Sequence, residues 1–374
     1  MSYFLAFAGF AALIILHEFG HFLAAKAVGM RVERFALFFP PLIARFRPKG
    51  SETEYGIGAI PLGGYVKITG MNPAEDIPPE VLPRAYFKQP VWKRIVVISA
   101  GPLVNIVLAF LILWVLILSQ GTTKPALAVH DVQSNTPAAN ALQPGDKILS
   151  IDGVRGYAPG LTKAEIDARA AALRKRIDAH RCGGRLVNGC VAATPARIVV
   201  LRAGRRVTLE ARPRYDATPG AKRMLLGFSF GRKVDVGPGE AASLAVTGMW
   251  GVTKTTVDRI VRLFYDSKAR KDVSGVVGSY EATRQSFEFD TVQAFSVLAL
   301  ISLSLGIINL FPFLPLDGGH IFWALAEKVR GRPIPFSVME KVGIVGFMLV
   351  IFLFYVGLSN DIGRLSSGQG FGVR

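Results

Sequence analysis

Residues 13–26 read LIILHEFGHFLAAK, so His17, Glu18 and His21 interrupt an otherwise apolar run. The run extends over residues 2–25, and about 20 apolar residues are enough for a helix to cross the hydrocarbon core of a bilayer. An ionisable side chain in such a helix costs about 2 to 3 kcal/mol or more unless it is paired, bound to a metal or in a water-filled cavity. We therefore expect these three side chains to form a functional site.

The spacing of the two histidines indicates what kind of site this is. Residues at i and i+4 project from one helical face about one turn apart, so His17 and His21 can bind one zinc ion. In the HExxH pattern the glutamate lies beside the open position of the metal, which makes Glu18 a general base. The alternative is a pair of histidines that pack between helices, with a structural glutamate.

The composition agrees with a membrane protein. Of the 374 residues, 51% are hydrophobic and only 19% are charged, and the apolar residues are concentrated in blocks. The net charge of +17 comes from basic residues that are scattered singly. Because a nucleic-acid surface needs basic tracts with interleaved aromatic residues, we expect no nucleic-acid partner.

The apolar blocks predict a multi-pass α-helical protein with membrane spans at residues 2–25, 95–118, 292–316 and 342–359. The first span lacks a basic leader and a cleavage site, so we expect it to be retained. Basic residues near the span ends place segments 26–94 and 318–341 in the cytoplasm. Residues 120–291 and both termini then lie outside a bacterial cytoplasmic membrane. The two halves of the membrane core are residues 1–120 and 292–374.

The outer segment is expected to hold one compact α/β domain at residues 121–235. Its residues 135–153, which include the turn Pro144-Gly145-Asp146, resemble the most recognisable stretch of a PDZ domain. Such domains bind an extended peptide, for example a C-terminus, as an added strand. Residues 236–291 are expected to form an amphipathic segment beside the membrane.

An insertion at residues 172–194 carries both cysteines of the chain, Cys182 and Cys190. In an oxidising compartment their spacing favours a disulfide over two free thiols.

A tetrahedral zinc ion bound by two histidines needs a third protein ligand and a water. The third span ends in NLFPFLPLDGGH, residues 309–320, where prolines and glycines break the helix. Spans one and three run in the same direction, so Asp317 reaches the depth of His17, about 21 Å along the first helix. Asp317 therefore completes a predicted His-His-Asp site. His320 is the alternative ligand, and a helix cap is the alternative role for Asp317.

Several stretches together resemble the site-2 protease family of intramembrane metalloproteases, in particular its bacterial regulators of sigma-factor signalling. They cover nearly the whole chain: HEFGH at 17–21, YGIGAIPLGGYVK at 55–67, SAGPLVN at 99–105, the PDZ-like stretch, and LDGGH at 316–320. The chain departs from the family in having room for one PDZ domain instead of two. It also has Leu314 where the second proline of the family motif stands, and Val276 in a common Gly-Pro-Val-Gly motif.

The resemblance implies a metalloendopeptidase with one zinc ion that cleaves transmembrane segments in regulated intramembrane proteolysis. Its substrates would be membrane proteins, such as an anti-sigma factor or a signal-peptide remnant. The resemblance also implies that Asn309 is catalytic and holds the substrate backbone or the developing oxyanion. A capping role for that amide is the alternative.

Residues 55–67 resemble the family's membrane-associated β-hairpin. A helical substrate must unwind before it can be cleaved, because its backbone groups are bonded internally. We expect the hairpin edge to pair with the unwound segment. The alternative is a structural hairpin that covers the cytoplasmic mouth of the site. The predicted substrate-binding residues are Gly56, Gly58, Ile60, Gly63, Gly64 and Tyr65.

Two functions without proteolysis are compatible with parts of this pattern. A membrane chaperone or scaffold with a PDZ adaptor would need no metal. An ion transporter could use intramembrane histidine and aspartate, but the predicted spans show no inverted repeat.

Overall fold

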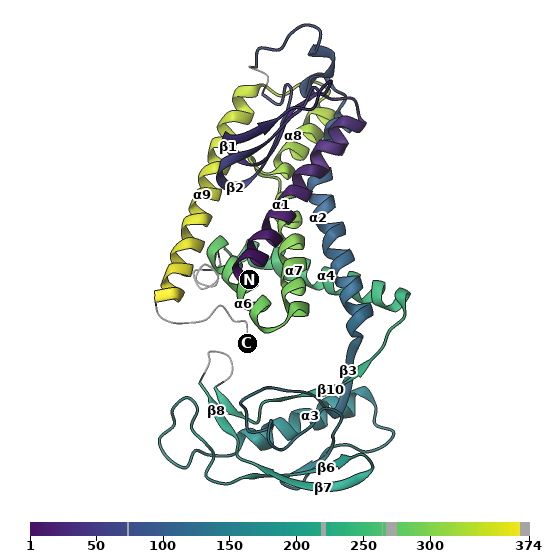
Figure 1. Ribbon diagram of the computed structural model, residues 1–374, viewed down its shortest axis with the longest axis vertical. Coiled ribbons are helices and arrows are strands. Elements are labelled where there is room, and N and C mark those ends of the chain that lie inside the picture. Colours follow the sequence, from purple (N-terminus) through teal and green to yellow (C-terminus); the bar gives the residue numbers. More distant parts are fainter. Residues whose placement is uncertain (73–74, 218–221, 264, 267–274, 367–374) are drawn as a thin grey trace. The chain divides into compact units, whose positions relative to one another are not determined.

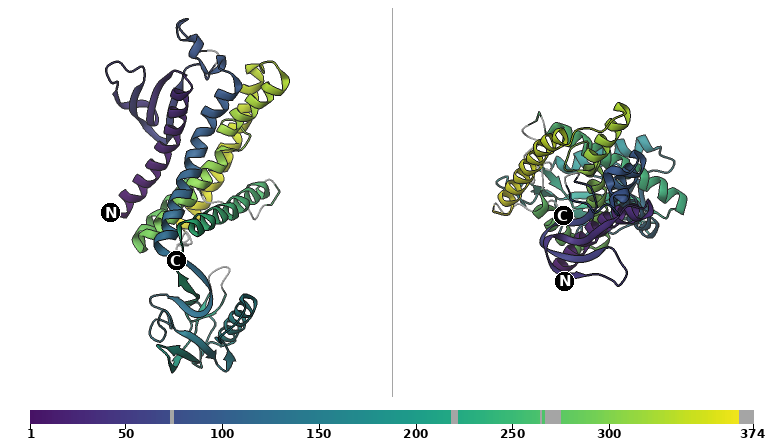
Figure 2. Two further views of the ribbon diagram at one scale, coloured as in Figure 1. Left: turned by 90° about the vertical axis from the view of Figure 1, so that its right-hand side faces the viewer. Right: turned by 90° about the horizontal axis from the view of Figure 1, so that it is seen from above.

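A computed structural model describes residues 1–72, 75–217, 222–263, 265–266 and 275–366. The chain divides into two compact units (Figures 1 and 2). The first unit contains residues 1–116 and 238–374, and the second contains residues 117–237. The boundaries of the second unit lie within a few residues of the predicted outer domain.

Within the described residues, four helices are long and apolar enough to cross a membrane. Their bounds are α1 Ser2–Ala27, α2 Val91–Gln120, α7 Thr291–Asn309 and, inside α9 Phe336–Ser366, the span Ser337–Arg364. The predicted number and order of spans are therefore confirmed. Two single-turn helices, Leu82–Arg84 and Tyr86–Lys88, precede α2.

The third span differs from its predicted bounds. Helix α7 ends at Asn309, seven residues before the predicted end at 316, and a new helix, α8 Asp317–Arg330, follows the connecting loop. Pro312 and Pro315 lie in this loop and cannot donate a helical hydrogen bond. An added Cβ on Gly318 would overlap the backbone of Leu310. The loop therefore folds back against the start of α8, which fixes the position of Asp317.

The hairpin is larger than predicted. Residues 55–67 are part of one long strand, β2 Glu54–Ile68, and the hairpin consists of β2 and β1 Val32–Phe46. Residues 34–37 of β1 pair on one side with residues 64–67 and on the other with residues 54–57. Both long strands thus bend into a four-segment sheet, which lies beside α1 (Figures 1 and 2).

The described residues of the predicted juxtamembrane segment form two helices. They are α4 Pro238–Arg262 and α6 Val276–Phe289, and the charged residues of α4 agree with an amphipathic helix. Asp361 of α9 is fully buried and accepts hydrogen bonds from the backbone N–H groups of Gly275 (3.0 Å) and Gly278 (2.7 Å). A carboxylate at a helix N-terminus satisfies unpaired donors and the helix dipole. Asp361 therefore joins α9 to α6.

The second unit is a mixed α/β domain. Its main sheet has the strand order β10-β3-β4-β6-β7, in which all neighbours are antiparallel, and β5 pairs with β4. Helix α3 Lys163–Asp178 begins with a capping box made by Thr162 and Glu165. The bounds of the strands are β3 Thr122–Val132, β4 Lys147–Ile151, β5 Val154–Arg155, β6 Ala196–Arg202, β7 Arg205–Ala211, β8 Arg214–Asp216, β9 Arg223–Leu225 and β10 Phe228–Val234.

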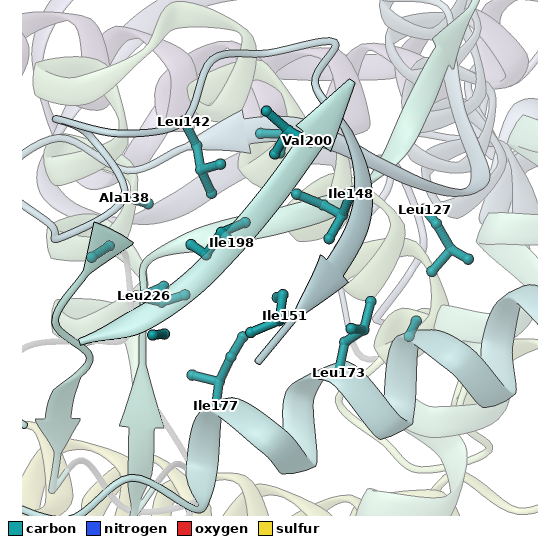
Figure 3. Packing of buried hydrophobic residues seen from close by; sticks show 14 residues of the cluster. Leu127, Ala138, Leu142, Ile148, Ile151, Leu173, Ile177, Ile198, Val200 and Leu226 are labelled. Atoms are coloured by element: carbon teal, nitrogen blue, oxygen red, sulfur yellow. The ribbon is translucent and has the colours of Figure 1, made fainter. Parts of the chain in front are cut away.

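One apolar core holds this unit together (Figure 3). Ile198 and Val200 are alternate residues of β6, and both are fully buried in one cluster with Leu173 of α3. Ile148 and Ile151 of β4 belong to the same cluster and lie on either side of a register shift in that strand. The alternation in β6 is the pattern from which the strands were predicted. The predicted insertion continues α3 and then forms a small loop that is paired at Cys182 and Ala192.

A buried ion pair fixes the PDZ-like turn. Asp146 is 1% exposed and accepts hydrogen bonds from Arg202 (2.6 and 2.8 Å) and from the backbone N–H of Gln143 (2.9 Å). Burial by itself raises the pKa of Asp146. The Arg202 guanidinium and the Gln143 N–H lower this pKa by more than burial raises it, so the pKa of Asp146 lies below its usual value.

Replacing Asp146 by asparagine should destabilise the second unit by about 2 to 3 kcal/mol, because a buried partner of Arg202 loses its charge. Hydrogen exchange of the β4 amides in the full chain measures this change. The folded-state pKa is depressed, so the stabilisation is complete above about pH 4 and disappears as the pH falls through that pKa. The natural chain and the variant should therefore become equally stable in acid. A difference independent of pH would contradict the role of the charge.

Candidate metal centre

Helix α1 presents both histidines toward the interior of the first unit. His17 is 8% exposed and His21 is 7% exposed. Their Nε2 atoms lie 3.3 Å apart, as the i, i+4 spacing predicts for neighbouring side chains on one face. Glu18 lies between them in sequence and is half-buried.

Asp317 enters this group from the first residue of α8. Its Oδ2 atom lies 3.3 Å from the Nε2 of His17 and 3.3 Å from the Nε2 of His21. In the described part of the chain, these three residues are a group of potential metal ligands whose donor atoms lie within 4.8 Å of one another. The structure thus brings together the three residues that the sequence predicts as zinc ligands.

The dimensions of this triangle fit a zinc ion. Zinc binds histidine nitrogen and carboxylate oxygen at about 2.0 to 2.1 Å in a tetrahedron, so two ligand atoms lie about 3.3 to 3.4 Å apart. All three separations in the cluster are 3.3 Å. The Oδ2 atom of Asp317 is also buried without a hydrogen-bond partner. A buried acceptor without a partner is costly, and a bound cation would satisfy it.

Residues of helix α2 contact the Nδ1 atoms of both histidines. The Nδ1 of His21 donates a hydrogen bond to the backbone carbonyl of Val97 (2.8 Å). This bond holds the tautomer in which Nε2 is free for a metal. An added Cβ on Gly101 would overlap the His21 ring, and one on Gly20 would lie 2.7 Å from the carbonyl oxygen of Ala100. Glycine at both positions is therefore needed for the two helices to approach.

The Nδ1 of His17 is contacted by a side chain, whereas that of His21 is contacted by a backbone carbonyl. The Nδ1 of His17 lies 3.2 Å from the carboxamide of Asn105, which is fully buried. The sequence pattern predicts no individual role for Val97, Gly101 or Asn105, although residues 99–105 carry part of the family resemblance. A polar Asn105 inside an apolar span was the signal that could have identified it.

A buried ion pair holds the other end of α8. Arg94, near the start of α2, donates two hydrogen bonds to Glu327 at 2.9 and 2.6 Å, and Arg94 is 9% exposed. Because α8 carries Asp317 at its first residue and Glu327 in its last turn, this pair fixes the direction of the helix. Asp317 is thereby held toward α1.

The structure also places His320, the alternative ligand, and Asn309, the residue predicted to act on the substrate. His320 follows Asp317 by three residues on α8 and does not belong to the group of potential ligands found among the described residues. Asn309 is the last residue of α7 and is half-buried.

One predicted substrate-binding residue lies directly at the site. An added Cβ on Gly64 would overlap Cγ of Glu18 and lie 3.1 Å from its Cδ. Gly63 adopts a positive φ of 132°, and an added Cβ on Gly58 would overlap the backbone of Phe39. Gly56, Ile60 and Tyr65 belong to the same strand β2.

Cys182 and Cys190 belong to the second unit, where the structure joins them in a disulfide. The residues of the metal cluster all belong to the first unit, so the disulfide is not part of the metal centre.

Comparisons with known proteins identify the family. The model of peptidase family M50 matches residues 5–353. A protein of Nostoc sp. that is named as a zinc metalloprotease is 30% identical over 368 residues, which cover 94% of this chain and 93% of that protein. The regulator of sigma E protease of Salmonella typhi is 27% identical over 440 residues, which cover 94% of this chain and 96% of that protein. A protein of Arabidopsis thaliana that is named as a probable chloroplastic membrane metalloprotease is 32% identical over 356 residues, which cover 91% of this chain and 75% of that protein.

The spans, the HExxH helix and these matches define an intramembrane zinc metalloprotease. The chain belongs to peptidase family M50, the site-2 protease family. The predicted resemblance, the enzyme class and the zinc cofactor are therefore confirmed, and a chaperone or scaffold without proteolysis is not favoured.

Proposed function

We propose that His17, His21 and Asp317 hold the zinc ion and that Glu18 is the general base for cleavage of a peptide bond within a transmembrane segment. The observation that carries this assignment is the triangle of donor atoms with sides of 3.3 Å. Two structural facts support it further. Asp317 has a buried oxygen without a hydrogen-bond partner, and His21 is held in the ligand tautomer by Val97.

The chemistry divides between the metal and the chain. A bound zinc ion supplies a Lewis acid for the scissile carbonyl and lowers the pKa of a water toward about 7. Glu18 accepts a proton from the attacking water and delivers it to the leaving amine nitrogen. Glu18 is half-buried beside Gly64 of β2, so its carboxylate is only partly solvated.

Substitution of Glu18 by glutamine should leave the zinc content unchanged and lower cleavage of a reporter span by about 100-fold or more, because the proton acceptor is lost. His21→Ala and Asp317→Ala should lose both zinc and turnover. Metal analysis of the purified chain together with a cleavage assay separates the two outcomes. Normal cleavage by the Glu18→Gln variant would disprove the general-base assignment.

The substrate backbone is proposed to bind along strand β2. Residues 64–67 pair with β1 on one side, and no other strand among the described residues pairs with them. An unpaired strand edge offers backbone donors and acceptors to an extended peptide. Gly64 also touches Glu18, so a peptide on this edge lies near the general base. Gly63 and Tyr65 flank Gly64 and belong to the same proposed edge. Gly58 and Ile60 lie farther along β2, whereas Gly56 pairs with β1 on both sides and offers no free edge to a peptide.

Replacing Gly64 by alanine should lower the rate of cleavage by about tenfold or more with zinc retained, because the added methyl group overlaps the Glu18 side chain. Gly363→Ala is the matched control, since nothing lies within 4 Å of an added Cβ at that position. Full activity in the Gly64 variant would contradict the proposed contact.

An apolar groove offers a place for the part of the substrate that stays helical. The groove has a volume of about 740 Å³, and α2, α4 and α7 contribute its walls. Phe311 and Pro312, in the loop that leads to Asp317, close one end, and Ile106 next to Asn105 lines another part. We therefore assign this groove to the transmembrane segment of the substrate.

Asn309 is proposed to act on the substrate. It ends α7 at the loop that carries the chain to Asp317. From there its carboxamide can hold the substrate backbone or the developing oxyanion, as the family resemblance implies.

The proposed setting is a bacterial inner membrane. Basic residues of segments 26–94 and 318–341 favour a cytoplasmic position, with the active site toward that side and the second unit and both termini outside. An oxidising outer compartment agrees with a Cys182–Cys190 disulfide. The proposed substrates are membrane proteins such as an anti-sigma factor or a signal-peptide remnant.

The second unit is proposed to be a PDZ-like filter for substrates. The resemblance in residues 135–153 and the open edges of its sheet at β7 and β10 support this role. An edge strand can bind a peptide C-terminus exposed by an earlier cleavage. The same unit can exclude substrates whose outer domains have not been removed.

Removing the filter should allow cleavage of an untrimmed substrate. Lys124 and Arg232 are paired residues of neighbouring antiparallel strands, so an Asn-Gly turn can replace residues 125–231. The shortened chain should keep its zinc content and cleave trimmed and untrimmed reporters at similar rates, whereas the natural chain should prefer the trimmed one. An unchanged preference after the deletion would argue against the filter.

A further inference from the structure

The carboxamide of Asn105 is a polar group of the metal centre that the proposed mechanism does not use. Asn105 lies on α2 with an exposure of 0%, and one end of its carboxamide is 3.2 Å from the Nδ1 of His17. The other end, placed as Oδ1, is buried without a hydrogen-bond partner. Ser302 of α7 donates a hydrogen bond to the backbone carbonyl of Asn105 (2.9 Å) and does not contact the carboxamide through that bond.

Zinc binding by His17 determines which end of the carboxamide faces the ring. The Nε2 of His17 points into the ligand triangle, so in a neutral imidazole bound through Nε2 the Nδ1 atom carries the proton. A protonated Nδ1 needs an acceptor. The two ends of a carboxamide have the same shape, and hydrogen-bond partners decide which end is the oxygen.

We propose that Asn105 is a positioning residue for zinc binding, with its Oδ1 accepting a hydrogen bond from the Nδ1–H of His17. This inference rests on the proposed zinc site and extends it. The bond fixes the ring orientation and tautomer of His17, as the Val97 carbonyl does for His21. The difference is that Val97 acts through its backbone, which no substitution removes, whereas His17 depends on a side chain.

When Oδ1 faces His17, the NH₂ group of Asn105 occupies the buried position that has no hydrogen-bond partner. The NH₂ group is then the unpaired end of the carboxamide. An aspartate would keep the acceptor and remove that unpaired donor. Asn105→Asp and Asn105→Leu therefore have different predicted effects on zinc binding. Both residues are close in size to asparagine, but only aspartate can accept the hydrogen bond.

The test measures zinc affinity of the full chain in detergent by competition with a chromophoric chelator. Asn105→Leu should bind zinc about 10- to 100-fold more weakly than the natural chain, and Asn105→Asp should bind within about tenfold of it. The visible spectrum of the Co²⁺ form should shift in the leucine variant. Ser302→Ala is the control, because it removes a hydrogen bond to the backbone of Asn105 and leaves the carboxamide intact.

The outcomes separate this inference from the proposed zinc site. If the natural chain binds no zinc, the site itself is wrong. If the natural chain binds zinc and the leucine variant binds it equally tightly, the role of Asn105 is wrong. If the leucine variant does not fold, the aspartate variant decides, because loss of zinc affinity beyond about tenfold in that variant overturns the proposed acceptor.

Discussion

The close approach of α1 and α2 is the constraint on which the membrane unit depends. Gly20 and Gly101 leave no room for a Cβ between the two helices. This contact lets backbone and side-chain groups of α2 reach the rear nitrogens of both histidines. Polar side chains in an apolar helix are stable only if such partners surround them. A larger residue at either glycine would therefore separate the imidazoles from their supports as well as from Asp317.

The site could be predicted from the sequence because its strongest signals are local. His17, Glu18 and His21 lie within one helical turn, so the helical period alone places the histidines together. Asp317 could be predicted because the direction of the spans and the broken third helix limited the candidates at that depth. Asn105 was missed because a single amide in an apolar span has no periodic partner. Its role depends on a contact between two helices that sequence spacing does not encode.

The fold was less predictable where long-range pairing decides it. Residues 55–67 alternate as a strand should, but alternation does not reveal that one strand pairs with two segments of its neighbour. The end of α7 was placed seven residues too late, because apolar residues continue through the loop after Asn309. Hydropathy indicates how long an apolar stretch is. The prolines and the packing of Gly318 against Leu310 determine where helix α7 ends within that stretch.

The distance in sequence between the ligands has a consequence for biosynthesis. His17 and His21 lie near the start of the chain, and Asp317 follows about 300 residues later. At a synthesis rate of about 5 to 20 residues per second, the third ligand appears roughly 15 to 60 s after the first two. During that interval the growing chain holds only a two-histidine site of low affinity. With the proposed ligand set, complete metal binding would therefore have to follow synthesis of the third span and of the start of α8.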